Sequence, residues 1–106
     1  MSAMWPGLPA DSGLDLLGQE ILAEKAAALG RAGERLEAAL AALGAIAGAW
    51  RAAGAPGERA RLAQDYDVAW RAAEAARTAL LIQREAVGLR DERVVDQQFP
   101  RPPRRP

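Results

Sequence analysis

The chain has 106 residues, enough for one domain, and its 14 basic side chains balance its 14 acidic ones. It contains no histidine and no cysteine, which excludes the common zinc patterns, thiol nucleophiles, histidine acid–base chemistry and a disulfide framework. The balanced charge gives no overall field that attracts nucleic acid or an anionic membrane.

These totals predict a non-enzymatic protein that needs no cofactor or metal and does not bind nucleic acid. The lack of cysteine suits a reducing compartment, so we expect a cytoplasmic location. Heavy use of alanine, glycine and arginine is typical of a GC-rich bacterial gene.

Residues 1–12 are predicted to be a flexible segment, because two prolines and a glycine interrupt any helix, with Trp5 available to dock on the body. The segment lacks the charged and apolar regions of a signal peptide. Ser12 and Asp15 then fit a helix start: the serine hydroxyl accepts from a free backbone N–H, and the carboxylate suits the first turn. A helical domain over 13–99 is predicted to begin here.

Residues 14–53 predict one long helix, since they contain no proline and repeat apolar residues at alternating steps of three and four. This spacing is typical of a helix packed along another, as in a coiled coil. The repeat comprises Leu22, Ala26, Leu29, Gly33, Leu36, Leu40, Leu43, Ala47 and Trp50. The longest uncharged run, 38–50, is shorter than the roughly 20 residues of a membrane span, so none is expected.

Glycines inside this helix leave two interpretations open. Each costs about 0.5–1 kcal/mol relative to alanine. They would let a neighbouring helix approach closely, as Gly44 and Gly48 would on one side. Alternatively, the helix breaks near Gly30 and Gly33, giving three core helices instead of two.

The segment 53–57 predicts a tight connection. Gly54 suits a left-handed helix cap, and Pro56 suits the first turn of a following helix. So short a link makes the two helices antiparallel neighbours. The second helix is predicted over 57–87 with Gly88 as its cap.

A short third helix is predicted over 91–99. Its apolar side would consist of Val94, Val95 and Phe99, and Pro100 ends regular structure. The fold class is therefore all-α: a long antiparallel helical hairpin with a short C-terminal helix.

An alanine-lined hairpin buries little apolar area, so we expect it to be completed as a four-helix bundle by dimerisation or by another protein. Val68 and Ile82 form a second apolar strip on the back of the second helix and are candidate partner-binding residues. The alternative is that they are scattered surface aliphatics, which are normal.

Charged residues suggest a polar site at the open end of the hairpin. In an antiparallel register, paired positions sum to about 111, which places Lys25 near Glu85, Arg84 near Glu24, and Glu34 near Arg77. Lys25, Arg84 and Glu85 would then be structural ion pairs or a contact site for a partner, a small ligand or a regulator.

Residues 100–106 are predicted to form a disordered, solvated tail, because proline and arginine dominate them. Pro100 and Pro103 also match the minimal spacing of proline-rich recognition segments. Trp50, Tyr66 and Trp70 lie on the helix seams, where they predict core packing rather than a stacking platform for nucleic acid.

Residues 20–33 and 83–91 resemble a family of small, uncharacterised proteobacterial all-helical proteins. The resemblance implies a bacterial, mostly helical protein whose shared polar residues include Glu24, Lys25, Arg84 and Arg90. It implies no activity. Arg90 thereby joins the candidate partner-binding residues, and the arginine-proline tail departs from the family pattern.

The leading hypothesis from the sequence is a protein–protein interaction or self-associating structural module. The alternative is a small-ligand or regulatory binding protein that uses the charged open end of the hairpin.

Overall fold

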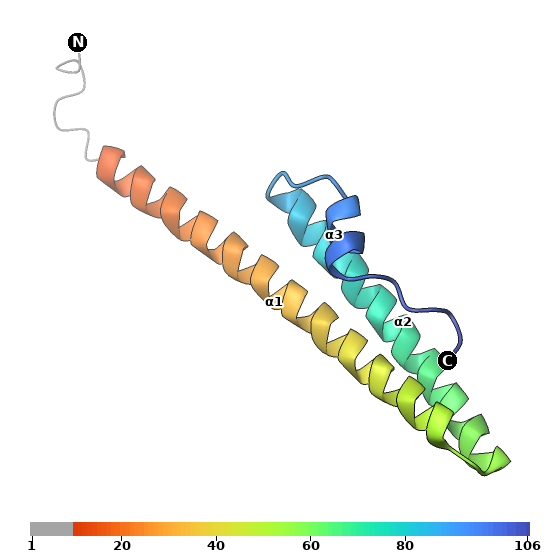
Figure 1. Ribbon diagram of the computed structural model, residues 1–106. Coiled ribbons are helices and arrows are strands. Elements are labelled where there is room, and N and C mark those ends of the chain that lie inside the picture. The colour runs from red at the N-terminus through yellow and green to blue at the C-terminus, as the bar shows by residue number, and fades with distance from the viewer. Residues whose placement is uncertain (1–9) are drawn as a thin grey trace.

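A computed structural model describes residues 10–106, with side chains from residue 13 onwards. It contains three helices, α1 (Ala10–Ala52), α2 (Pro56–Ala86) and α3 (Arg93–Gln98), and no strand over that range (Figure 1). The two long helices run antiparallel and pack against each other, and α3 lies beside α2. The all-α hairpin with a short third helix is confirmed. The predictions for Trp5 and for the side chain of Ser12 fall outside the described residues.

Helix α1 is continuous for 43 residues and passes through Gly30 and Gly33 without a break. Alanine, leucine, glutamate and arginine dominate it, and their strong helix propensity offsets the cost of the glycines. The predicted close approach of a neighbouring helix at Gly44 is wrong, because a Cβ added there would meet no atom within 4 Å. A Cβ added at Gly48 would meet only the side chain of Arg51, at 3.9 Å.

The connection between α1 and α2 consists of a tight closure of α1 followed by an extended residue before Pro56. Ala53 closes α1 by donating its N–H to the Trp50 carbonyl at 3.3 Å, and Ala55 is extended, as the residue before a proline should be. Pro56 opens α2 in the predicted position. The left-handed cap predicted at Gly54 is wrong, since this tighter closure does not require it.

Gly88 is the one residue of the described chain with a positive φ, 86°, and it ends α2 as predicted. Its N–H donates to the Glu85 carbonyl at 3.0 Å, and the Leu89 N–H donates to the Arg84 carbonyl at 2.9 Å. This is the Schellman pattern, in which a glycine turns the chain away from the helix axis. The turn sends the chain back towards the hairpin, where α3 forms.

The core lies where α3 meets the hairpin. Leu36 of α1, Leu80 of α2 and Val95 of α3 are buried together with Ala32. Nearer the α1–α2 connection, Leu43, Tyr66 and Ala73 are also buried. Of the predicted apolar side of α3, Val95 is buried, Phe99 is half-buried, and Val94 is exposed.

The tail, residues 100–106, is extended, as its prolines predict, but it lies against the hairpin (Figure 1). From α3 it runs along α2 towards the α1–α2 connection. The sequence predicts a disordered, solvated tail. The structure gives the tail specific contacts with α2, while five of its seven residues stay exposed. The physical reason is that side chains of α2 satisfy the carbonyls and the charge of the tail.

The N-terminal part of α1 has no neighbour among residues 10–106. Helix α2 has 31 residues against the 43 of α1, so α1 extends beyond the end of α2. Every residue over 13–27 is exposed except Gly18, which is half-buried. Within the described chain, no helix has a window long and apolar enough to cross a membrane.

Candidate functional site

Four of the six predicted partner-binding residues line one hollow of about 340 Å³ at the end of α2. They are Ile82, Arg84, Glu85 and Arg90. Lys25 is exposed on the free part of α1 and lies outside this hollow, and Val68 is 69% exposed in the middle of α2. The structure therefore brings together the α2 end of the predicted site but adds neither Lys25 nor Val68 to it.

The predicted ion pairing between the two helices at the open end is wrong. Glu24 pairs within its own helix, with its Oε1 3.0 Å from Nη2 of Arg31. Nη2 of Arg84 donates to the Asp91 carbonyl at 3.3 Å. The reason is the turn at Gly88, which brings the loop after α2 within reach of Arg84 in place of Glu24.

Arg77 is the charged side chain whose role the sequence does not reveal. It is 2% exposed, its Nη1 lies 3.2 Å from Asp96 Oδ1, and its Nη2 donates to the Phe99 carbonyl at 2.7 Å. Its Nε lies 3.6 Å from Glu74 Oε2, too far for a hydrogen bond, and has no other partner. The predicted partner Glu34 is not among its contacts. Arg77 thus fastens α3 and the start of the tail to α2.

Two aromatic side chains of α2 hold the backbone of the tail. The Tyr66 hydroxyl donates to the Pro103 carbonyl, and Nε1 of Trp70 donates to the Pro102 carbonyl at 3.4 Å. Proline has a carbonyl but no N–H, so acceptors are all that Pro102 and Pro103 offer from their backbone. Burial raises the pKa of the Tyr66 hydroxyl, partly opposed by the nearby Arg104, and this keeps the phenol protonated as a donor.

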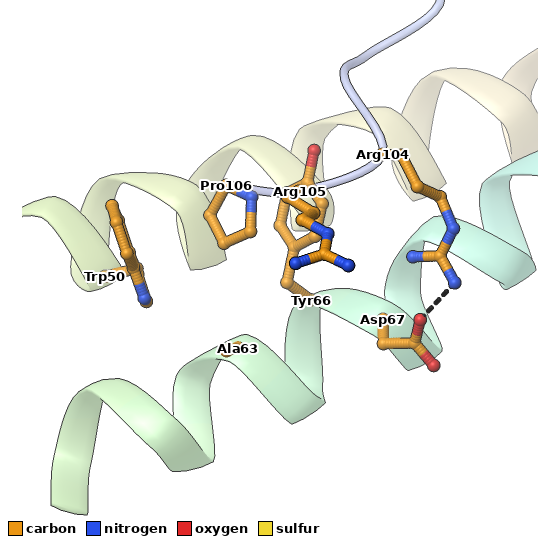
Figure 2. A pocket seen from close by; sticks show the side chains of 7 residues that line it. All are labelled: Trp50, Ala63, Tyr66, Asp67, Arg104, Arg105 and Pro106. Atoms are coloured by element: carbon orange, nitrogen blue, oxygen red, sulfur yellow. Dashed lines mark hydrogen bonds and ion pairs between the residues drawn. The ribbon is translucent and has the colours of Figure 1, made fainter.

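Two arginines of the tail lie near carboxylates, and one of them also contacts an aromatic ring. Arg101 lies 3.8 Å from Glu74 and 4.0 Å from Asp96, measured between nitrogen and carboxylate oxygen. Figure 2 shows the Arg104 guanidinium reaching the Asp67 carboxylate, with which it forms a hydrogen-bonded ion pair. The guanidinium carbon also lies 4.5 Å from the centroid of the Trp70 ring. The hydrogen bond from Arg104, assisted by the charges of Arg104 and Arg71, lowers the pKa of Asp67, which stays ionised.

The tail covers an apolar groove between α1 and α2. A hollow of about 410 Å³ remains beneath it, lined on the α1 side by Leu40, Leu43, Gly44, Ala47 and Arg51. Tyr66 forms part of the same wall, and four tail prolines face it: Pro100, Pro102, Pro103 and Pro106. Gly44 therefore widens the groove, since it leaves open the space that a side chain would fill.

The groove continues past Tyr66 towards the α1–α2 connection. Figure 2 shows this further hollow, of about 590 Å³, with Trp50 and Ala63 at one end and the Asp67–Arg104 pair at the other. Arg59 stacks on Trp50, with its guanidinium carbon 4.0 Å from the ring centroid. We name the surface formed by Leu43, Gly44, Tyr66, Asp67 and Trp70 the tail groove.

The aromatic residues were predicted to be core, and only Tyr66 is fully buried. Trp50 and Trp70 are half-buried and line the two ends of the covered surface. The available signal in the sequence was Asp67 between two aromatic residues on one helix, together with a proline-rich segment that also carries arginines. Pairing the two requires contacts 32 to 37 residues apart, which local periodicity does not supply.

A second surface is the free part of α1. Leu14, Leu17, Ile21 and Leu22 are 66%, 52%, 48% and 66% exposed. At 3.6 residues per turn, Leu14, Ile21 and Leu22 lie within about 60° of the direction of the buried Leu36, and Leu17 borders them at about 100°. We name these four residues the free stripe. Leu16, 58% exposed, lies on the opposite side of α1.

Over the described residues, no group of three or more acidic side chains is placed to hold a metal ion. No family model, no curated protein and no solved structure matches the chain. The resemblance to small proteobacterial helical proteins therefore stays a prediction, and the function is argued from the surfaces of the molecule.

Proposed function

We propose that the chain is a non-enzymatic interaction module that self-associates through the free stripe of α1. The observation that carries this proposal is the exposure of Leu14, Leu17, Ile21 and Leu22 on one side of a helix that extends beyond its neighbour. Exposed aliphatics scattered singly are ordinary, but these four follow one another on one face.

A second copy of the chain is the occupant that this geometry favours. The free stripe continues the face of α1 that packs on α2, and Leu22, Leu29, Leu36 and Leu43 succeed one another at intervals of seven residues. A face built for helix packing needs another helix with the same spacing. The free part of α1 in a second copy provides it, because a two-fold arrangement brings the same patch of both copies together.

Gly18 favours a close crossing of the two copies. It lies between the exposed Leu14 and Leu22 on the free stripe, and a Cβ added there would meet no atom within 4 Å. In a two-fold antiparallel crossing centred on Gly18, Leu14 of one copy faces Leu22 of the other. The two copies would thereby complete a helical bundle at the free end of α1.

The expected affinity is moderate. Burying an aliphatic side chain fully contributes about 1.5–3 kcal/mol, while association costs about 4–15 kcal/mol. Four partly exposed side chains from each copy exceed that cost by a small margin. The dimer is therefore expected to be weak and to dissociate on dilution through the high micromolar range.

Sedimentation equilibrium over a series of concentrations tests the proposal. Wild-type protein is expected to be dimeric at high concentration, and Leu22→Glu is expected to be monomeric, because it places a charge in the shared face. Leu16→Glu is the matched control on the opposite side of the same helix and should dimerise like wild type. A wild-type chain that remains monomeric at submillimolar concentration contradicts the proposal.

A second candidate function is supported by the hollow at the end of α2. Arg84 and Arg90 line it together with Ile82 and the carboxylates of Glu85 and Glu92, which suits a small ligand that carries an acidic group. The test is thermal melting with inorganic phosphate. Binding should raise the melting temperature of wild type but not of Arg90→Ala, whereas equal melting curves with and without phosphate contradict a phosphate site.

A further inference from the structure

We propose that the tail groove is a recognition site for extended segments of sequence Pro-Pro-Arg, and that the tail is its internal occupant. The expected ligand is a proline-rich segment with a following arginine in another protein. This site is separate from the free stripe, so peptide binding and self-association are tested by different substitutions.

The first argument is that side chains of the groove form hydrogen bonds with the backbone of the tail. A proline-rich segment in the extended left-handed conformation exposes its carbonyls, and it loses little entropy on binding because proline restricts its backbone beforehand. Tyr66 and Trp70 donate side-chain hydrogen bonds to two successive prolyl carbonyls, Pro103 and Pro102. An aromatic-lined groove with such donors is how proline-rich peptides are recognised in general.

The second argument is that the groove also recognises one side chain of the tail, that of Arg104. Arg104 contacts the carboxylate of Asp67 and the ring of Trp70 at the same time. Oδ2 of Asp67 also lies 3.4 Å from Nη2 of Arg71 in the same helix. The hydrogen bond from Arg104 and the two arginine charges lower the pKa of Asp67, so it is a fixed negative charge in the groove. Lysine lacks the planar guanidinium that makes both contacts, so arginine is the favoured residue at this place.

The third argument is that the groove offers more surface than the tail fills. Hollows of about 410 Å³ beneath the tail and about 590 Å³ beside it remain lined by Leu43, Gly44, Trp50 and Ala63. Tight packing would leave no such spaces around a segment that belongs to the core. The directional contacts that hold the tail are two hydrogen bonds and ion pairs, and a ligand of the same sequence can replace those at residues 102–104.

The tail competes with any such ligand. A segment attached through a short linker has an effective concentration in the millimolar range, so binding from solution is weakened while the tail is in place. A ligand must therefore either match the tail in affinity or encounter a tail that has detached. The tail thus limits access to its own groove.

The test uses full-length protein and a fluorescently labelled peptide, Arg-Pro-Pro-Arg-Arg-Pro. In the tail variant, Pro102→Gly, Pro103→Gly and Arg104→Ala are combined. This removes the two proline rings and the guanidinium, leaves the carbonyls on a flexible backbone that loses more entropy on docking, and leaves the groove intact. Fluorescence anisotropy should show that this variant binds the peptide about tenfold or more tightly than wild type, because its groove is free. Circular dichroism checks its helicity, and Arg104→Glu alone replaces it if the triple substitution lowers the helix content.

Groove substitutions in the tail variant identify the site. Trp70→Ala should weaken peptide binding about tenfold, because it removes one hydrogen bond and the ring under arginine. Val68→Ala, two residues away and outside the groove, should leave it unchanged. Asp67→Lys should reverse the preference between this peptide and one whose fourth residue is glutamate.

Two results overturn the proposal. The first is a helical tail variant that fails to bind the peptide, or that binds the glutamate peptide equally well. The second is a wild-type dimer that disappears in the tail variant but persists in Leu22→Glu, since the tail of a second copy would then be the natural occupant of the groove.

Discussion

The two halves of α1 show how the same kind of sequence gives a covered and an uncovered surface. Both halves carry leucines spaced three, four and seven residues apart. In the half near the connection, Leu36 and Leu43 are 0% and 1% exposed, because α2 and the segments after it pack on them. In the free half, Leu14 and Leu22 are each 66% exposed. Periodicity thus predicts that a face of α1 will pack, and the length of α2 decides how much of that face α2 covers.

The largest expected effect comes from equal truncations in the two halves. Leu36→Ala should lower the free energy of unfolding by about 2–5 kcal/mol, since it removes buried methylenes and leaves a cavity. Leu22→Ala should change it by less than about 0.5 kcal/mol when measured at low concentration, because Leu22 is exposed. Denaturant titration followed by circular dichroism measures both, and equal losses would show that the halves do not differ.

Arg77 sharpens the comparison, because it fixes α3 and the tail over the covered half. Arg77→Ala should cost about 2 kcal/mol, since it removes hydrogen bonds of a charged group to Asp96 and Phe99. Arg71→Ala, in an exposed ion pair with Asp67, is the control and should cost less than about 1 kcal/mol. Thermal melting distinguishes the two, and an unchanged melting temperature in Arg77→Ala would contradict the role assigned to Arg77.

Gly30 tests the continuity of α1 between the two halves. Gly30→Ala should stabilise the protein by about 0.5–1 kcal/mol, because the helix is unbroken and the added Cβ meets no atom within 4 Å. Denaturant titration measures the gain. A destabilised variant would indicate that the helix is interrupted there.

The smallest expected effect is a pH dependence confined to the docked tail. The pKa of Asp67 lies below its ordinary 3.8, so its contribution is present above pH 3.8 and is lost as pH falls through the lowered value. The pKa of Tyr66 lies above its ordinary 10.0, so its contribution is present below pH 10.0 and is lost as pH rises through the raised value. Comparing unfolding free energies across pH for wild type and Asp67→Asn checks the acid side, where only wild type should show the Asp67 loss.

Most of the fold follows from local signals. The absence of proline over 14–53, Pro56 at a helix start and Gly88 at a helix end each act within one or two turns, so the sequence predicts them well. Gly54 was assigned a left-handed cap wrongly, because a tighter closure of α1 competes with that cap.

The candidate sites depend on contacts that local signals do not specify. Composition correctly indicates that residues 100–106 form no helix, but their position depends on Tyr66, Asp67 and Trp70, more than thirty residues earlier. Similarly, Arg84 was predicted to reach across to α1, and the turn at Gly88 provided a nearer acceptor. The sequence therefore predicts the helices better than it predicts what lies on them.

The continuity of α1 has a consequence for anything bound at both of its surfaces. Leu17 and Leu43 belong to one uninterrupted helix, so the free stripe and the tail groove are separated by about 39 Å at 1.5 Å per residue. Inserting a single residue between them would lengthen this spacing slightly but would also rotate one surface by about 100° relative to the other. The helix therefore fixes both the distance and the relative orientation of partners bound at the two surfaces.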